Sequence, residues 1–190
     1  MLLQDERVDP SDEDNYVVRL ASQYGKTEVV KILLNDERVD PSANDNNAIV
    51  SASASGQTAV VQMLLKDRRV NPSANENFAI RYASKFGYTD IVMMLLMDDR
   101  VDPAAQNNDA IRLALHFERI KTLQILLKDR RVHPAAENNY PFRYASEHGF
   151  TEIVQMLLQD QRVDPSADDN YSIRFASKGG YTEIVQMLLQ

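Results

Sequence analysis

Residues 72–102 read PSANENFAIRYASKFGYTDIVMMLLMDDRVD, and the same pattern recurs through the whole chain. A proline opens each copy, and these prolines are 31 residues apart without one insertion or deletion: Pro10, Pro41, Pro72, Pro103, Pro134 and Pro165. A fixed period of this length is typical of a repeat protein, in which each copy is one structural unit. The sequence therefore predicts a single domain, residues 1–190, with repeats at 10–40, 41–71, 72–102, 103–133, 134–164 and 165–190.

Each copy predicts two short helices. In the third copy, Ile80 and Ala83 follow the helical spacing, and Gly87 supplies a turn that can take a positive φ at low cost. We expect the side chains of Asn77 and Thr89 to cap the first and second helix. Helices of about ten residues are marginally stable alone in water. The copies must therefore stack into an elongated, all-α helix-turn-helix solenoid.

The segment that connects two copies carries two further fixed features. A valine column is expected to fill the stack between copies: Val39, Val70, Val101, Val132 and Val163. An aspartate also recurs two residues before an arginine, which predicts a ladder of ion pairs and loop hydrogen bonds between copies. The pairs are Asp36 with Arg38, Asp67 with Arg69, Asp98 with Arg100, Asp129 with Arg131, and Asp160 with Arg162.

Residues 79–96, AIRYASKFGYTDIVMMLL, and residues 141–158, PFRYASEHGFTEIVQMLL, resemble the ankyrin repeat, whose core reads roughly TPLHxAAxxGHxEIVxxLL. The alanine, the turn glycine, the acid before Ile-Val and the Leu-Leu pair coincide, and Pro141 falls on the family's proline. This 31-residue form resembles arrays in protists and large DNA viruses.

Two features depart from the ankyrin pattern. The period is 31 residues where the family usually has 33, and the missing residues fall in the segment that carries a β-hairpin finger in the family. The resemblance therefore implies shortened finger loops. An arginine also stands where the family has histidine, in five of the copies: Arg19, Arg81, Arg112, Arg143 and Arg174.

Composition excludes several classes of protein. The chain has 190 residues, 28 of them acidic and 21 basic, and contains no cysteine, so it has no disulfide, thiolate metal site or thiol nucleophile. The net charge of −7 argues against nucleic acid or an anionic membrane as a partner, because both require clustered Lys and Arg. Residues 1–6, MLLQDE, do not resemble a signal peptide, and no apolar run is long enough to span a membrane. We expect an intracellular, cytoplasmic location.

The sequence offers no constellation for chemistry. His116, His133 and His148 lie in different copies, and no two have metal-ligand spacing on one helix face, so we interpret them as solvent-facing. The glycines supply turns and form no phosphate loop. A serine column lies on the packed side of the first helix and offers no nucleophile: Ser22, Ser53, Ser84, Ser146 and Ser177. We predict no enzymatic activity, no catalytic residue, no metal and no cofactor.

Positions that vary between copies share one face of the first helix. In the ankyrin family, first helices and fingers line a concave surface that holds protein partners, so the resemblance implies that a protein partner binds here. Aromatic side chains on such a face are typical interface anchors. The candidate partner-binding residues are Tyr16, Phe78, Tyr82, Lys85, Tyr140, Tyr144, Glu147, Tyr171, Phe175 and Lys178.

Three alternatives stay open at this point. Tyr82, Tyr144 and Phe175 precede the fixed alanine and could pack against a neighbouring copy instead of a partner. The fourth copy lacks the turn glycine and the threonine in residues 115–121, which indicates either tolerated drift or a hinge. Both ends look like internal copies, so the chain is either part of a longer array or associates end to end. A structural spacer that stacks end to end is therefore the alternative function.

Overall fold

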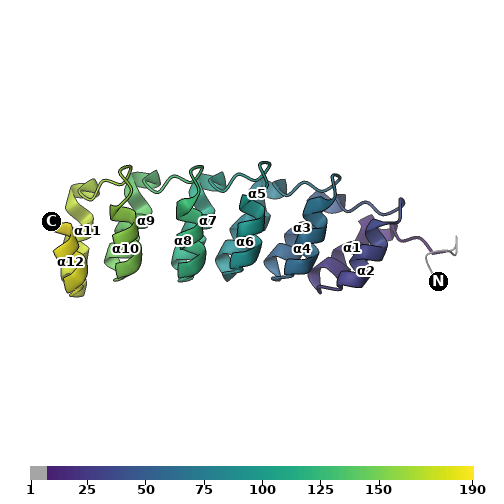
Figure 1. Cartoon of the computed structure of the whole chain (residues 1–190), viewed down its shortest axis with the longest axis horizontal. Coiled ribbons are helices and arrows are strands. Elements are labelled where there is room, and N and C mark those ends of the chain that lie inside the picture. Colours follow the sequence, from purple (N-terminus) through teal and green to yellow (C-terminus); the bar gives the residue numbers. More distant parts are fainter. Residues whose placement is uncertain (1–7) are drawn as a thin grey trace.

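The computed structural model describes residues 8–190, which form twelve α-helices and no strand (Figure 1). The first helices of the six copies are α1 (Asp12–Gln23), α3 (Ala43–Ala54), α5 (Ala74–Phe86), α7 (Ala105–His116), α9 (Ala136–Glu147) and α11 (Ala167–Gly179). The second helices are α2 (Thr27–Leu34), α4 (Thr58–Lys66), α6 (Thr89–Leu96), α8 (Ile120–Lys128), α10 (Thr151–Leu158) and α12 (Thr182–Leu188). The prediction of an all-α repeat is confirmed.

The helix pairs stand side by side in an elongated array, with the loops between pairs along one edge (Figure 1). Each first helix contacts the first helices before and after it, so these helices form one layer of the solenoid and the second helices form the other. The connecting segments, such as residues 35–42, contain turns but no strand. The finger loops are therefore short, as the 31-residue period predicts.

The core runs through the array between the two layers. Its largest fully buried side chains come from every internal copy: Phe142, Ile49, Leu64, Ile80, Ile91, Leu95, Ile111, Leu115, Leu123, Leu126, Ile153 and Leu157. The valine column of the connecting segments is buried as well, so the prediction that it fills the stack is confirmed. Apolar burial on this scale supplies the main driving force for stacking short helices.

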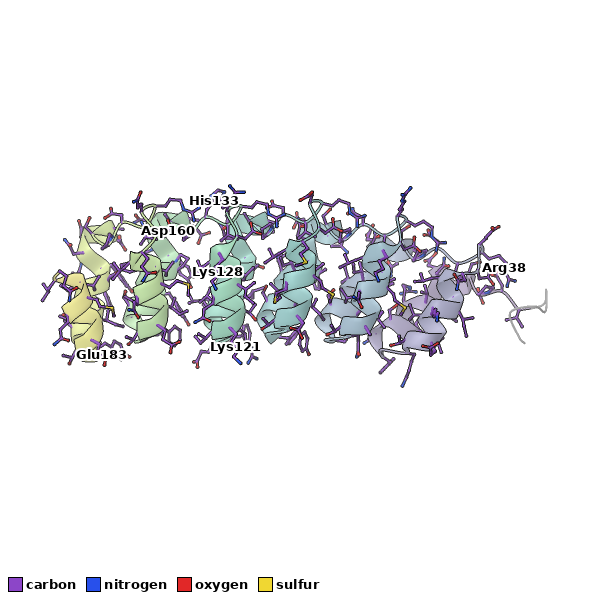
Figure 2. The ribbon with its side chains drawn as sticks, in the orientation of Figure 1. Arg38, Lys121, Lys128, His133, Asp160 and Glu183 are labelled. Carbon is purple, nitrogen blue, oxygen red and sulfur yellow. The ribbon has the colours of Figure 1, made fainter. Side chains whose placement is uncertain are left out.

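The Asp-Arg ladder lies along the loop edge, where Figure 2 labels Arg38, His133 and Asp160, whereas Lys121 and Glu183 lie along the opposite edge. Within each copy the arginine pairs with the aspartate two residues earlier, for example Arg69 Nη2 with Asp67 Oδ2 at 2.6 Å. Arg69 Nη1 donates to the carbonyl of Val39 in the preceding copy at 2.9 Å. Arg69 Nη2 also donates to the carbonyl of Leu34 in the preceding copy at 3.0 Å. The expected ladder is therefore corrected in one respect: the ion pair lies within a copy, and the hydrogen bonds to the two carbonyls cross the junction.

Hydrogen bonds from the arginine hold the pKa of Asp67 below its usual value, against the opposing effect of desolvation. The same pattern lowers the pKa of the equivalent aspartates Asp98, Asp129 and Asp160. Each pair stays charged at neutral pH, so each guanidinium remains available to bridge to the preceding copy.

Each first helix begins with a left-handed turn of three residues whose φ angles lie between 51° and 61°. In the third copy these are Asn75, Glu76 and Asn77. Asn and Asp tolerate this conformation best among the non-glycine residues, which accounts for the polar run in every copy. Asn77 does not cap its helix as expected. Its buried Oδ1 instead accepts the backbone N–H of Asp102 at 2.7 Å, and so holds the last residue of the same copy just before Pro103 opens the next.

The threonine that opens the second helix in five copies does not act as an N-cap either. Thr89 is already inside α6, and its hydroxyl donates to the carbonyl of Gly87 at 3.3 Å. The same hydroxyl lies 2.9 Å from that of Thr122, which occupies a buried position that carries Ile or Val in the neighbouring copies. The divergent fourth copy therefore keeps a polar core residue because the third copy supplies its hydrogen-bond partner.

Candidate functional site

The predicted binding residues lie together on the first-helix layer, and none of them is buried. Tyr16 and Lys178 are exposed, and the rest are half-buried: Phe78, Tyr82, Lys85, Tyr140, Tyr144, Glu147, Tyr171 and Phe175. The sequence left open whether Tyr82, Tyr144 and Phe175 pack against a neighbouring copy or face a partner. In the structure each side chain is half-buried, so it packs partly within the array and is partly exposed to solvent. The first helix aligns these residues because positions four apart share a face.

Aromatic pairs on this face stack within single helices. The rings of Phe78 and Tyr82 stack with centroids 3.7 Å apart, and those of Tyr171 and Phe175 with centroids 4.0 Å apart. Stacked rings of this kind form rigid, preorganised surfaces that lose little entropy on binding. They are suited to anchoring a partner.

The fifth copy arranges its rings differently. Tyr140 and Tyr144 are tilted by 38°, with centroids 5.7 Å apart, because Tyr144 stacks on His148 at 3.9 Å. His116 of the fourth copy lies 4.7 Å from the Tyr144 ring and shares a hydrogen bond with the Tyr140 hydroxyl. We define these four residues, His116, Tyr140, Tyr144 and His148, as the central ring cluster.

Cationic side chains of the chain itself cover the other two groups of rings. Lys85 Nζ lies 5.2 Å from the ring of Tyr82 and 5.0 Å from that of Phe117. Lys178 Nζ lies 5.5 Å from the ring of Phe175. These distances are within the range of cation–π attraction. The predicted contact residues Lys85 and Lys178 therefore already interact with aromatic faces of their own array.

Glu147 occupies the same row in the fifth copy but carries the opposite charge. Its Oε2 accepts a hydrogen bond from the Tyr171 hydroxyl at 2.8 Å. Burial of the Tyr171 hydroxyl and this bond to the carboxylate raise the pKa of Tyr171. The row predicted from the sequence thus provides a cation in copies three and six and an anion in copy five.

The arginine column that departs from the ankyrin pattern connects adjacent first helices. Arg81 pairs with Asp109 at 2.7 Å, and Arg112 bridges Asp109 at 3.1 Å and Glu137 at 3.2 Å. Arg143 pairs with Asp168 of the next copy at 2.6 Å. These bridges were not predicted from the sequence, although an acidic residue 25 positions after an arginine was a usable signal for two of them, Arg112 with Glu137 and Arg143 with Asp168.

An open cavity of about 400 Å³ lies between α7 and α9. Its walls are Asp109, Arg112, Leu113, His116, Phe117, Glu137 and Tyr140. Two further cavities lie at the same junction: one of about 630 Å³ between α8 and α10, and one of about 210 Å³ around Ile120 and Phe150. The junction between copies four and five is therefore the site where the array is most open, and α7 packs less closely on α9 than the other neighbouring first helices pack on each other.

Glu118 accounts for this opening. It stands where all five other copies have the turn glycine, with φ +56°. At Gly56 the next copy packs so closely that an added Cβ would lie 2.7 Å from the Tyr88 ring, and at Gly149 it would lie 2.5 Å from the Tyr181 ring. Because Glu118 has a side chain at this point, Phe150 cannot approach in the same way, and the fifth copy stands further from the fourth.

The three histidines are exposed, as interpreted from the sequence. His116 and His148 nevertheless contact the rings of the fifth copy, which the sequence did not indicate. Within residues 8–190, no three His, Asp or Glu side chains come close enough to hold a metal ion. In that same part of the chain, no helix has the length and apolar character needed to cross a membrane.

Comparison with known proteins places this geometry in a family. A model of three consecutive ankyrin repeats matches residues 1–76, and a model of a single ankyrin repeat matches residues 137–170. The chain belongs to the ankyrin repeat family. Ankyrin repeats are generally protein–protein interaction modules, and the ankyrin fold is typically non-enzymatic. No curated protein sequence matches the chain closely enough to add to this assignment.

Solved structures share the ankyrin architecture at low sequence identity. An ankyrin repeat domain from Acinetobacter baumannii AYE has a TM-score of 0.75 and 22% identity, with 93% of this chain and 97% of that chain covered. A chain in the structure of a predatory endopeptidase from Bdellovibrio bacteriovorus in complex with an immunity protein has a TM-score of 0.69 and 16% identity. That match covers 90% of this chain and 96% of the other. At these identities the likeness extends to the fold alone.

Proposed function

We propose that this ankyrin array is a non-enzymatic scaffold that binds a partner protein on its first-helix face. The observation that carries the proposal is the set of half-exposed aromatic pairs on that face in copies three, five and six. Large aromatic residues that stay partly in solvent are unusual on a surface without a partner and typical of binding anchors. The repeat scaffold fixes their positions, so little order has to be gained on binding.

The packing of the layers supports the choice of face. Neighbouring first helices approach each other more closely than neighbouring second helices do. An array packed in this way curves with the first-helix layer on the inside. The aromatic pairs then line the concave surface, where several copies can contact one partner at the same time.

Replacing Phe78, Tyr140 and Tyr171 together with serine is expected to abolish capture of the partner from a lysate of the source organism or its host. These rings supply the apolar anchors, and losing anchors of this kind typically costs at least 2 kcal/mol of binding free energy each. The measurement is a pull-down with the wild type and the variant, after circular dichroism shows that both are folded. The matched control replaces three exposed residues on the other layer, Ile32, Met93 and Met97, with serine. Equal capture by all three proteins would contradict the proposal.

A second candidate function, end-to-end stacking, is favoured by the terminal copies. Val17 is 43% exposed and Val29 48% exposed, whereas their counterparts Ala48 and Val60 in the second copy are buried. In the sixth copy, Ile173 and Val185 are half-buried although their counterparts in the other copies are buried. The surfaces that copies use to join each other are thus partly open in the first and last copies.

If the array stacks end to end, the weight-average mass is expected to rise with concentration and to continue beyond a dimer, because a head-to-tail contact does not close. Sedimentation velocity over a concentration series measures this. The Val29→Glu variant places a charge in the contact and is expected to remain monomeric. A wild type that stays monomeric at the highest concentration would remove this candidate.

A further inference from the structure

We propose that the central ring cluster binds a lysine or arginine side chain of the partner protein, an inference that rests on the proposed function of this face. The cluster differs from the other aromatic groups in its charge environment. Copies three and six place the chain's own lysines over their rings, at 5.2 to 5.5 Å. Across residues 8–190, no Lys or Arg lies over the ring of Tyr140 or Tyr144.

The residue that would supply such a cation is replaced in the fifth copy. Lys85 and Lys178 occupy the row in which the fifth copy has Glu147. A carboxylate is not attracted to the negative face of an aromatic ring, so Glu147 places no cation over Tyr140 or Tyr144, whose ring neighbours are His116 and His148. In copies three and six, the aromatic rings at the equivalent positions are therefore paired with a lysine ammonium group.

The charge around the cluster is suited to the same ligand. Burial raises the pKa of the Tyr144 hydroxyl, and the negative charges of Glu118 and Glu147 raise it further. Glu118 is exposed and, in the described part of the chain, its carboxylate forms no hydrogen bond or ion pair. The charges of Arg112 and Arg143 also act on Tyr140. Arg112 is paired with Asp109 and Glu137, and Arg143 with Asp168. A positive group at the rings would therefore find free carboxylate charge close by.

The open junction supplies room for the ligand. The cavity of about 400 Å³ between α7 and α9 is lined by His116 and Tyr140 of the cluster, and by Phe117. Glu118, which supplies the free carboxylate, replaces the turn glycine of the fourth copy at this junction. A long, flexible side chain can enter beside the rings and keep its cationic end near the acids. Lys and Arg have this shape, with an apolar stem and a charged end.

The test uses the complete chain and the peptide Gly-Ser-Gly-Lys-Gly-Ser-Gly, capped at both ends. Aromatic NMR signals of Tyr140 and Tyr144 are expected to shift saturably with the peptide at millimolar concentration. The same peptide with norleucine has the hydrocarbon stem without the ammonium group, and we expect it to bind about tenfold more weakly. Equal binding of the norleucine peptide, or stronger binding of a phenylalanine peptide, would overturn the inference in favour of an apolar anchor.

Two variants sharpen this test. Glu147→Lys places a lysine in the row where copies three and six have one. The ammonium group of this lysine should lie over the rings and weaken binding of the lysine peptide at least tenfold. Glu183→Lys changes the net charge equally on exposed α12 and is expected to leave the affinity nearly unchanged. Equal loss in both variants would mean that only overall charge matters, and would overturn the proposed site. Tyr144→Leu keeps apolar area but removes the ring face, and it too should lose the peptide.

The outcomes separate this inference from the proposed function. If the triple serine variant loses its partner while the lysine and norleucine peptides bind equally, the face binds a protein but the cationic anchor is wrong. If the lysine peptide binds selectively while the triple serine variant retains its partner, the cluster binds a cation but the proposed binding face is wrong.

Discussion

Replacing Phe142 with alanine is expected to lower the free energy of unfolding by about 3–5 kcal/mol. Phe142 is the largest of the fully buried side chains and lies in the fifth copy, next to the most open junction of the array. The other internal copies carry a buried isoleucine in this position: Ile49, Ile80 and Ile111. Removing the ring leaves a cavity that short helices, held by their neighbours on both sides, can fill only in part.

The change is also expected to split the unfolding transition. Stability in a repeat array is a sum of terms from each copy and each junction. The junction before the fifth copy is already open. A further loss of packing energy there should let copies five and six unfold before the rest of the array. Urea titrations followed by circular dichroism and by tyrosine fluorescence should then no longer coincide.

The conservative change Phe142→Ile restores the residue of the other copies and is the control. It is expected to cost less than about 1.5 kcal/mol, because most of the apolar volume stays. A loss below about 1 kcal/mol for Phe142→Ala would show that the fifth copy is not packed around this ring.

Periodicity was enough to predict the architecture. The 31-residue period, the valine column and the turn glycines all follow from spacing that a single copy displays and the others repeat. Each of these features acts within one copy or acts in the same way at every junction, so the repeating sequence pattern is enough to predict it. The same reasoning identified the face that presents the aromatic residues.

Hydrogen-bond partners far along the chain could not be predicted in this way. Asn77 and Thr89 both have the residue type of a helix cap, and local preference favours that role. In the folded array, Asn77 instead satisfies a buried N–H group 25 residues later. Asn77 ends the three-residue left-handed turn at the start of the first helix, and the preference of Asn for this conformation does not identify the distant N–H that its side chain accepts.

The cavity between α7 and α9 could not be predicted from the sequence either. The sequence drew attention to the fourth copy through its missing glycine, but not to the consequence for packing. That consequence depends on how closely an aromatic ring of the next copy approaches the turn glycine in copies two and five, which only the folded array shows. Whether the fourth copy is also a hinge stays a hypothesis. Hydrogen exchange as fast in residues 118–127 as in a mobile loop would support it.

Replacing Gly56 with alanine is expected to lower the free energy of unfolding by about 2–4 kcal/mol. One part, about 1 kcal/mol, comes from the positive φ of 73°, which disfavours a residue with a Cβ. The other part, about 1–3 kcal/mol, arises because that Cβ would lie 2.7 Å from the rigid ring of Tyr88. Thermal and urea unfolding of the full chain measure the sum.

Gly180→Ala separates the two contributions. Gly180 has nearly the same φ, 74°, but an added Cβ would meet nothing within 4 Å, so its substitution should cost only the backbone part. In a Tyr88→Ala background, Gly56→Ala should cost no more than Gly180→Ala, because the ring that it strikes is gone. Equal losses for Gly56→Ala and Gly180→Ala in the wild-type background would contradict the explanation. The turn glycine would then serve backbone conformation alone, and Glu118 would no longer account for the open junction.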